Sequence, residues 1–523
     1  MAGRTSIQID RFGPGVFMEN SILRTAGWVL AALLFLAPVT SVRAADLTPV
    51  TLKVMTFNIW LGGDQVNFQK TIDAIKAADA DIVCLQEAGG NTARIAAALG
   101  WSYAVPARHV IARVPLFAPP AKEQGYDGND LNMVYAEVEP GRFIAIANVH
   151  LPSDPYGPTE LRDGKPVAEV LEMERSARLT AIESYIAPMT ALVKAGTPAV
   201  LSGDFNSLSP LDWRPDLIKR WPQVMEKLVW PAQQAMLDAG FIDTYRAAHP
   251  DPARLGITWS YGYPYPYLKP NEQIDRIDFI MAAGTVKTIK SEILGDPRMP
   301  DTDIGVSPWP SDHRAVVSTL EVVPGPAPAM VSIDHRSVPS GAVLTARFHA
   351  ETEDGRLEGG RLVILKADAA ADAAPLVSRV SNNGTDRASS VDFGTTGLAP
   401  SAYVVALRDD KDKELARAPF WLVDRDGAAA LTLDKSSYAP GETITATWSN
   451  APGNRYDWLG IYKKDEASDD SYLYFFYVNG TVAGSLALTK DLVGADLEPG
   501  SYELRLELDD GYSRMAAVPF EVK

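Results

Sequence analysis

The chain has 523 residues, of which 46% are hydrophobic and 22% charged, with a formal net charge of −17 and a single cysteine. This length predicts about three domains, each with enough apolar residues for its own core. A disulfide within the chain is excluded, and the acidic balance disfavours a broad nucleic-acid interface, which needs surfaces rich in Lys and Arg. The cysteine, Cys84, stands in the apolar run DIVCL and is expected to be a buried, unreactive thiol.

The first 45 residues have the pattern of a secretory signal peptide. Residues 18–24 form a polar start, residues 26–39 are apolar, and small residues follow at 41–45. The apolar run is shorter than the ~20 residues that span a bilayer, which favours a cleaved leader over a membrane anchor. The mature chain is therefore expected to begin near Asp46, to be secreted or periplasmic, and to have no transmembrane span.

Residues 46–323 alternate short apolar strands with helical stretches, which predicts a mixed α/β domain. The expected strands are LKVMTFNIW, DIVCLQE, FIAIANVHL, TPAVLSGDFN, RIDFIMA and AVVSTLEV. Between the first two, Phe68, Ile72 and Ile75 have the spacing of one helix face.

Residues 324–329 are rich in proline and are expected to form a linker. Residues 330–425 and 426–523 each contain short alternating strands between turn residues, which predicts two small β-sandwiches, the first of Ig-like type. The two lengths echo each other, because GLAPSAYVVALRDD and DLEPGSYELRLELDD both combine a turn with a late strand. The second length contains DWLGIYKKD and faintly resembles SKICH-type β-sandwich domains, and a spacer or stabilising role is the favoured interpretation.

Polar residues recur where the strands of the α/β domain end. They are Asn58, Glu87, His150, Asp204, Asn206, Asp275, Asp278, Asp312 and His313. Each has a structural alternative by itself, such as an Asx-turn at Asp204 or an ion pair between Asp278 and Arg276. If the sheet gathers these ends, carboxylate and amide oxygens can bind Mg²⁺ while aspartate and histidine activate water. The set therefore suits hydrolysis of a phosphate ester.

The ordered blocks TFNIW, LQE, NVHLP, GDFNS, RIDFI and SDHRA resemble the endonuclease/exonuclease/phosphatase superfamily over about residues 53–322. That superfamily includes DNase I-like nucleases and neutral sphingomyelinases. The resemblance implies a four-layer α/β sandwich of DNase I-like type with its site at one edge, followed here by two small β-sandwich domains. It also implies a Mg²⁺ cofactor, with Mn²⁺ or Ca²⁺ as alternatives.

The same resemblance implies a metal site. Glu87 is expected to be the principal ligand with Asn58 beside it, and Asp312 is expected to lie in the metal's shell. Trp60 stands where apurinic endonucleases have an acid. This departure weakens a repair-nuclease or two-metal interpretation.

The catalytic roles follow from the resemblance as well. His150 is expected to contact or protonate near the scissile phosphate, Asp204 to orient or deprotonate the attacking water, and Asn206 to hold the phosphate. Asp278 is expected to orient His313. Whether Asp204 or His313 is the formal base stays open at this point.

Three tyrosines are candidate substrate-binding residues. Tyr156 lies in the loop after His150, and Tyr263 and Tyr265 lie in TWSYGYPYPYLKP. Aromatic rings beside a phosphate site stack on a base, a sugar or a choline-type cation. The alternative is that these loops pack on the domain's own surface.

The expected function is a secreted Mg²⁺-dependent phosphoesterase, which hydrolyses a phosphodiester or phosphomonoester of a lipid headgroup or small molecule by metal-assisted attack of water. The alternatives are a secreted nuclease with the same site and a catalytically silent binding scaffold. The expected partners are the phosphoester substrate and, peripherally, a membrane, while the acidic charge disfavours nucleic acid. Because no expected catalytic residue lies beyond Val322, a chain ending near Pro328 is expected to keep activity on a small ester.

Overall fold

The computed structural model describes residues 48–119, 131–213, 228–260, 272–333, 335–350, 360–380, 389–469, 471–493 and 496–523. The expected signal peptide and the two tyrosines Tyr263 and Tyr265 lie outside the described residues. In the part that is described, no helix is both long and apolar enough to cross a bilayer.

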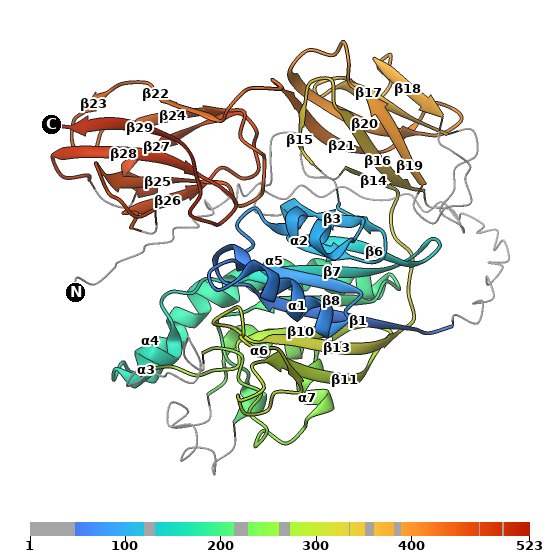
Figure 1. The fold of residues 1–523 in the computed structure, drawn as a ribbon, viewed down its shortest axis with the longest axis vertical. Coiled ribbons are helices and arrows are strands. Elements are labelled where there is room, and N and C mark those ends of the chain that lie inside the picture. The colour runs from blue at the N-terminus through green and yellow to red at the C-terminus, as the bar shows by residue number, and fades with distance from the viewer. Residues whose placement is uncertain are drawn as a thin grey trace, which may run out of the picture.

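Two β-sheets form the centre of the first domain (Figure 1). The strands of the first sheet are β1 (Val50–Asn58), β2 (Ile82–Gln86), β3 (Tyr103–Val105), β4 (Val110–Ala112), β11 (Val286–Gly295), β12 (Ile304–Gly305) and β13 (Ala315–Val322). Those of the second sheet are β5 (Leu116–Phe117), β6 (Met133–Glu139), β7 (Arg142–His150), β8 (Ala199–Asp204), β9 (Ile242–Asp243) and β10 (Asp278–Ala283). Their orders are β12-β11-β13-β1-β2-β4-β3 and β5-β6-β7-β8-β10-β9. All six strands expected from the sequence blocks are present.

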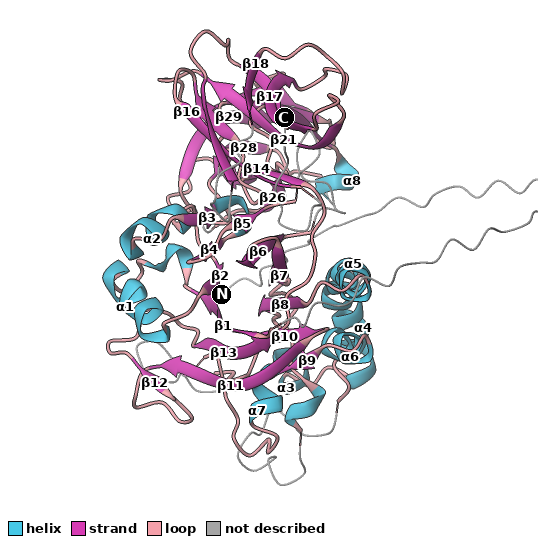
Figure 2. Cartoon of the chain, turned by 90° about the vertical axis from the view of Figure 1, so that its right-hand side faces the viewer, coloured by secondary structure: helices cyan, strands magenta, loops and turns pink. Residues whose placement is uncertain are grey.

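Helices cover the outer faces of both sheets, so the domain is a four-layer α/β sandwich (Figure 2). The helices are α1 (Phe68–Ala78), α2 (Thr92–Leu99), α3 (Gly157–Arg162), α4 (Val167–Glu174), α5 (Thr180–Lys194), α6 (Pro231–Asp238) and α7 (Thr244–Ala248). Shorter turns are η1 (Leu61–Gly63), η2 (Pro106–Arg108), η3 (Arg175–Leu179) and η4 (Pro210–Asp212). Helices α1 and α2 pack on the first sheet, whereas α5 and α6 pack on the second.

The alternation of side chains along each strand separates three cores. In β1, Leu52 and Val54 point into the core between the two sheets, whereas Met55 and Phe57 point outward against α1 and α2. Cys84 belongs to the core between the sheets and is fully buried, as the sequence predicts. Burial raises the pKa of its thiol to about 12, so it is inert.

Gly203 of β8 is the point at which the second sheet tolerates no side chain. Its φ is +148°, and a Cβ there would overlap the carbonyl oxygen of Val149 on the paired strand β7. We expect Gly203→Ala to destabilise the catalytic domain by at least about 2 kcal/mol, seen as a lower Tm in circular dichroism. Gly394, a strand glycine with open space around it, supplies the control Gly394→Ala, which should leave the Tm nearly unchanged. Equal Tm values for the two variants would contradict the close approach at Gly203.

Two β-sandwiches follow, and they share one topology. The first consists of β14 (Met330–Ile333), β15 (Ser337–Pro339), β16 (Val343–His349), β17 (Arg361–Lys366), β18 (Val377–Val380), β19 (Ser389–Gly394), β20 (Ser401–Arg408) and β21 (Glu414–Val423). The second consists of β22 (Ala430–Leu433), β23 (Ser437–Tyr438), β24 (Ile444–Ser449), β25 (Trp458–Lys463), β26 (Tyr474–Tyr477), β27 (Gly484–Leu488), the helix α8 (Lys490–Val493), β28 (Gly500–Glu507) and β29 (Arg514–Val522). The sheet orders β14-β16-β19 and β15-β21-β20-β17-β18 recur as β22-β24-β27 and β23-β29-β28-β25-β26.

Equivalent residues confirm that the two sandwiches are repeats of one plan. Lys366 pairs with Tyr403 across β17 and β20, and its ammonium lies 4.3 Å from that ring's centroid. Lys463 pairs with Tyr502 across β25 and β28, with its ammonium at 4.1 Å. These pairs fix the register in which the two domains are compared below. The strand bounds support the expected limits 330–425 and 426–523, which we propose as the domain boundaries.

The Pro-rich linker is packed against the first domain. Gly325 exchanges two backbone hydrogen bonds with Phe143, and the hydroxyl of Thr197 donates to the carbonyl of Pro326. Both sandwiches lie on the same side of the first domain (Figure 1). The three domains are thus in contact, which matters for the site.

Candidate active site

The expected site residues lie where the core between the two sheets turns polar at one end. In β8, Asp204 continues the inward face that Val200 begins, and in β10 Asp278 continues the face of Ile280. In the register of the second sheet, Asp204 stands opposite His150 of β7 on one side and Asp278 of β10 on the other. Strand alternation and register therefore bring these three side chains together.

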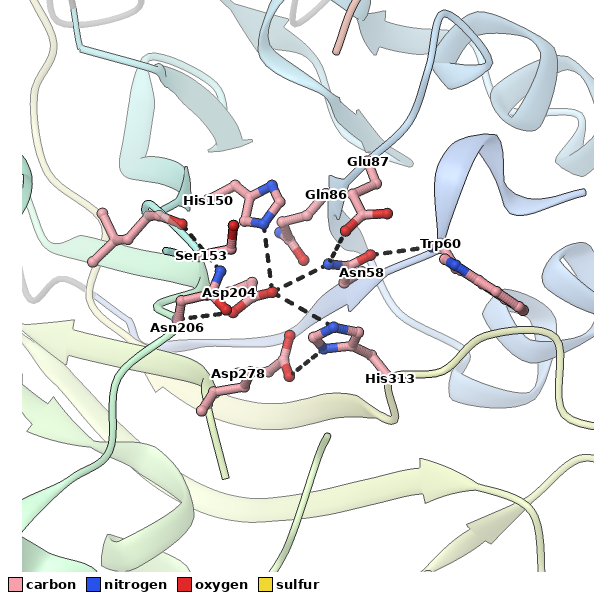
Figure 3. A network of polar contacts seen from close by, with 12 residues as sticks. Asn58, Trp60, Gln86, Glu87, His150, Ser153, Asp204, Asn206, Asp278 and His313 are labelled. Carbon is pink, nitrogen blue, oxygen red and sulfur yellow. Dashed lines mark hydrogen bonds and ion pairs between the residues drawn. The ribbon is translucent and has the colours of Figure 1, made fainter. Parts of the chain in front are cut away.

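Asp204 is the centre of the polar network (Figure 3). Its Oδ2 accepts a hydrogen bond from the Asn58 amide at 3.1 Å and lies 3.6 Å from Nε2 of His150 and 3.7 Å from Nε2 of His313. Its Oδ1 accepts from the backbone N–H of Asn206 at 2.9 Å, which is an Asx-turn. Asp204 therefore takes part in both the local turn and the shared site, and it is 1% exposed.

Asp278 holds His313 from the other side. Its Oδ2 lies 3.0 Å from Nδ1 of the imidazole, so the remaining ring nitrogen points toward Asp204. The alternative partner, Arg276, instead bonds to Asp212 and Asp243, each at 2.7 Å. The ion pair between Asp278 and Arg276 is therefore excluded, and the geometry fits the expected pairing with His313.

Glu87 stands at the edge of the pocket beside Asn58. The Asn58 amide donates to Oε1 of Glu87 at 3.0 Å, and the backbone N–H of Leu61 donates to Oε2 at 3.0 Å. Glu87 has a φ of +56°, and Trp60 and Leu61 have φ values of +56° and +46°. Such values are costly for residues with side chains and are typical of functional sites. The strained backbone turns the carboxylate from the strand end toward the pocket.

Two groups of side chains could hold a divalent metal ion. Asp204, Asp278 and His313 offer ligand atoms within 4.8 Å of one another, and Oδ1 of Asp278 is buried without a hydrogen-bond partner among the described residues. The expected pair, Glu87 and Asn58, offers the hard oxygen donors that Mg²⁺ prefers. Glu87 lines the pocket whereas Asp278 does not, so an ion at Glu87 can reach a bound phosphate. The donor set as a whole fits a divalent cation.

The charges of the central residues follow from burial and from each other. Burial lowers the pKa of His150, but Asp510 and Asp204 outweigh it and raise the value to about 9. Burial likewise lowers the pKa of His313, but Asp278 and Asp204 raise it well above its usual value. Burial and the nearby Asp278 raise the pKa of Asp204 to about 6. The neighbouring carboxylates therefore favour the charged form of both imidazoles, in which each is a hydrogen-bond donor, and Asp204 is the group that can accept a proton.

The other expected residues divide between the pocket and its support. Asn206 and Asp312 both line the pocket, and the Asn206 amide is oriented by the carbonyl of Leu151 at 3.0 Å. Burial and the neighbouring Glu87 raise the pKa of Asp312. Tyr156 does not line the pocket. Its hydroxyl instead donates a hydrogen bond to Asp275 at 2.7 Å. The geometry therefore favours the packing alternative for this tyrosine.

Two polar residues of the pocket floor were not expected. Gln86 donates to the side-chain oxygen of Asn148 at 2.7 Å, and Asn148 donates to the carbonyl of Leu85 at 2.9 Å. This pair joins β2 of one sheet to β7 of the other directly beneath His150. The available signal was that Asn148 interrupts an apolar strand two residues before His150, on the same face.

The second β-sandwich forms one wall of the pocket, whereas every site residue expected from the sequence lies before Val322. A pocket of about 530 Å³ has Glu87, Asp204 and His313 on one wall. On the other wall it is lined by seven described residues of the second sandwich: Tyr456, Trp458, Tyr472, Phe475, Tyr477, Asp510 and Tyr512. From that wall, Oδ2 of Asp510 lies 3.8 Å from Nδ1 of His150. The activity of a chain ending near Pro328 on a small ester stays a prediction, and that chain would lack this wall of the pocket.

A buried turn fastens this domain to the catalytic domain. Asp509 lies 2.8 Å from Nε2 of His109 and accepts a hydrogen bond from the backbone N–H of Gly90 at 3.0 Å. Asp509 is fully buried and has a φ of +49°. Burial lowers the pKa of His109, but Asp509 more than offsets this and raises it. The N–H donor to Asp509 belongs to Gly90, which is three residues after Glu87 in the catalytic domain.

Comparison with known proteins gives one sequence match and several structural likenesses. The model of the endonuclease/exonuclease/phosphatase family matches residues 55–313. No curated protein matches the chain. A solved endonuclease/exonuclease/phosphatase from Beutenbergia cavernae DSM 12333 is 17% identical, with 71% of this chain and 100% of that chain covered and a TM-score of 0.33. A humanized D. rerio TDP2 is 14% identical (52% and 99% covered, TM-score 0.30), and murine CEACAM1b is 10% identical (37% and 98% covered, TM-score 0.17).

Proposed function

Residues 55–313 belong to the endonuclease/exonuclease/phosphatase family, and on that premise we propose that the protein is a secreted, Mg²⁺-dependent phosphoesterase. Its substrate is a phosphodiester or phosphomonoester of a lipid headgroup or small molecule. The observation that carries the proposal is the convergence of Asn58, His150 and His313 on one carboxylate oxygen of Asp204, at the mouth of a pocket that also holds Glu87.

The residues divide the reaction among them. Asp204 accepts a proton from water as the water oxygen forms its bond to phosphorus, and the bond from phosphorus to the leaving oxygen breaks. His150 and His313 donate hydrogen bonds to the phosphoryl oxygens, and His150, the more exposed of the two, protonates the leaving oxygen. Asp278 keeps the His313 ring in the orientation that this requires. A divalent ion held by Glu87 and Asn58 would neutralise charge on the phosphoryl group.

The charge of the pocket favours a small or lipid ester over nucleic acid. The described lining residues include five carboxylates, those of Glu87, Asp154, Asp204, Asp312 and Asp510, and no Lys or Arg. A nucleic-acid strand brings many phosphates and needs basic residues along its path. Secretion, a leader at residues 1–45 and peripheral contact with a membrane remain parts of the same proposal.

We expect the full-length protein to hydrolyse bis(p-nitrophenyl) phosphate only when a divalent ion is present. Chelation with EDTA should abolish turnover, and Mg²⁺ should restore it, measured by release of p-nitrophenol. Asp204→Asn should be inactive because it removes the proton acceptor while keeping the shape of the side chain. A folded protein with no activity under any of Mg²⁺, Mn²⁺ or Ca²⁺ would favour the silent scaffold, and efficient cleavage of DNA would favour the nuclease.

A further inference from the structure

The five-stranded sheet of the second β-sandwich has an aromatic outer face. Along β25, Leu459 packs in the domain's core, so its neighbour Trp458 faces the other way. Along β26, Phe476 packs on the same core, whereas Phe475 and Tyr477 face outward. The outward face is directed at the catalytic pocket, because these three outward residues all line it.

Six aromatic residues of this domain line the pocket. They are Tyr456, Trp458, Tyr472, Phe475, Tyr477 and Tyr512. The Trp458 ring meets Tyr472, Phe475 and Tyr512 edge-on, with centroid distances of 5.3, 6.1 and 6.2 Å. The rings thus form one connected cluster that also lines the pocket, and we call this cluster the aromatic cage.

The first β-sandwich shows that the fold itself does not require these rings. In the shared register Trp458 corresponds to Arg361, since each begins the strand that ends at the aligned lysine. By the same register, Phe475 of β26 corresponds to Ser378 of β18. One copy of the repeat therefore carries the aromatic face, and it is the copy that closes the active pocket.

The charges around the cage select the kind of ligand. Asp510, held by the Tyr477 hydroxyl at 2.8 Å, lies between the rings and His150. Farther along the same face, the guanidinium of Arg505 already lies 4.0 Å from the ring centroid of Tyr462. The described lining has no Lys or Arg, and His150 and His313 lie at the phosphate end of the pocket. At the other end, aromatic faces beside a carboxylate attract a cation.

We propose that the second β-sandwich forms the subsite for the organic group of the phosphoester, and that this group carries a positively charged, alkylated ammonium. The inference rests on the proposed function, since it assigns what is attached to the scissile phosphate. The phosphate lies between Glu87 and His150, and the ammonium lies among the rings beyond Asp510. The substrate class is thus a phosphoester of an amino alcohol.

Binding of the organic group by itself provides a test that needs no catalysis. Choline and its uncharged isostere 3,3-dimethylbutan-1-ol have the same shape and differ in charge. We expect choline to bind the full-length protein at least about tenfold more tightly than the isostere, measured by tryptophan fluorescence or calorimetry. Equal affinity for the two compounds, or tighter binding of adenosine than of choline, would overturn the inference.

Two substrates separate the subsite from the hydrolytic centre. Phe475→Leu and Tyr512→Leu keep an apolar side chain and remove the ring, and each should lower kcat/KM for p-nitrophenyl phosphorylcholine about tenfold. Hydrolysis of bis(p-nitrophenyl) phosphate, which has no cation, should stay within about threefold of the parent protein. Leu473→Ala is the matched control, because Leu473 is 37% exposed and does not line the pocket.

The outcomes distinguish this inference from the proposed function. Equal losses on both substrates would show that the rings only support the fold, and the inference would fall while the hydrolase stands. Choline binding without hydrolysis of either ester would retain the subsite and reject the hydrolase.

Discussion

Glu87→Gln is expected to lower metal-dependent turnover about 10³-fold, which corresponds to about 4 kcal/mol of transition-state stabilisation. The substitution keeps the length of the side chain and one oxygen that can accept from Asn58 or Leu61. It removes the negative charge that would hold a hard cation. The measurement is kcat/KM for bis(p-nitrophenyl) phosphate across a range of Mg²⁺ concentrations.

The same variant decides between the two candidate metal positions. Calorimetric titration of Mn²⁺ should show weakened binding in Glu87→Gln if the ion lies at the pocket edge. Unchanged Mn²⁺ affinity would place the ion at Asp204, Asp278 and His313 instead. Asp64→Asn is the control, because Asp64 is a half-exposed carboxylate whose contact with Arg94 is 3.8 Å long. It should leave both metal affinity and turnover unchanged.

Asp278→Asn is expected to lower kcat by about 10² or more with little change in KM, because it disturbs the imidazole that acts in the transition state. Asp278 lies 3.0 Å from Nδ1 of His313 and does not line the pocket, so it acts on the reaction only through its neighbours, the His313 ring and the pKa of Asp204. His313→Ala should lower kcat at least as far. The double variant should be scarcely slower than His313→Ala alone, since residues that act as a unit are not additive.

The double-variant cycle also tests a purely structural role for Asp278. Losses that multiply independently would show that the carboxylate serves something other than His313. Loss of the folded state, seen as a collapse of the Tm in Asp278→Asn, would show that its burial is the dominant role. A normal Tm with a coupled loss of kcat is the result that the geometry predicts.

The catalytic domain and most of its site could be predicted from the sequence for a simple reason. Most site residues stand just at the end or the start of an apolar strand that can be recognised in the letters, as Asp204 does at the end of the run from Val200. Short or amphipathic strands were missed, among them β6 and β11, because their polar residues hide the period. Asp278 and Arg276 illustrate another limit, since opposite charges two residues apart suggest an ion pair, whereas Asp278 contacts His313 and Arg276 contacts Asp212.

The aromatic wall could not be assigned to the site from the sequence. Its rings belong to a β-sandwich whose letters indicate only alternating strands, and no local pattern tells which face meets another domain. For Tyr156 the sequence misled in the other way. Its position after His150 suggested a substrate-binding role, but its hydroxyl donates a hydrogen bond to Asp275. The sequence therefore predicted the wall of the pocket that the catalytic domain forms, and not the wall that the second β-sandwich forms.

The attachment of Asp509 to the catalytic domain has a consequence for how the protein reaches its working form. The hydrogen-bonded partners Gly90 and Asp509 are 419 residues apart in the chain, and His109 and Asp509 are 400 apart. Contacts of such sequence separation form late, after the entropy of closing the intervening chain has been overcome. During synthesis the catalytic domain emerges first with an open pocket, and selectivity arises only when the final sandwich has folded and docked. A nascent or prematurely terminated chain would therefore differ from the finished protein in which esters it accepts, before it differs in whether it can cleave them.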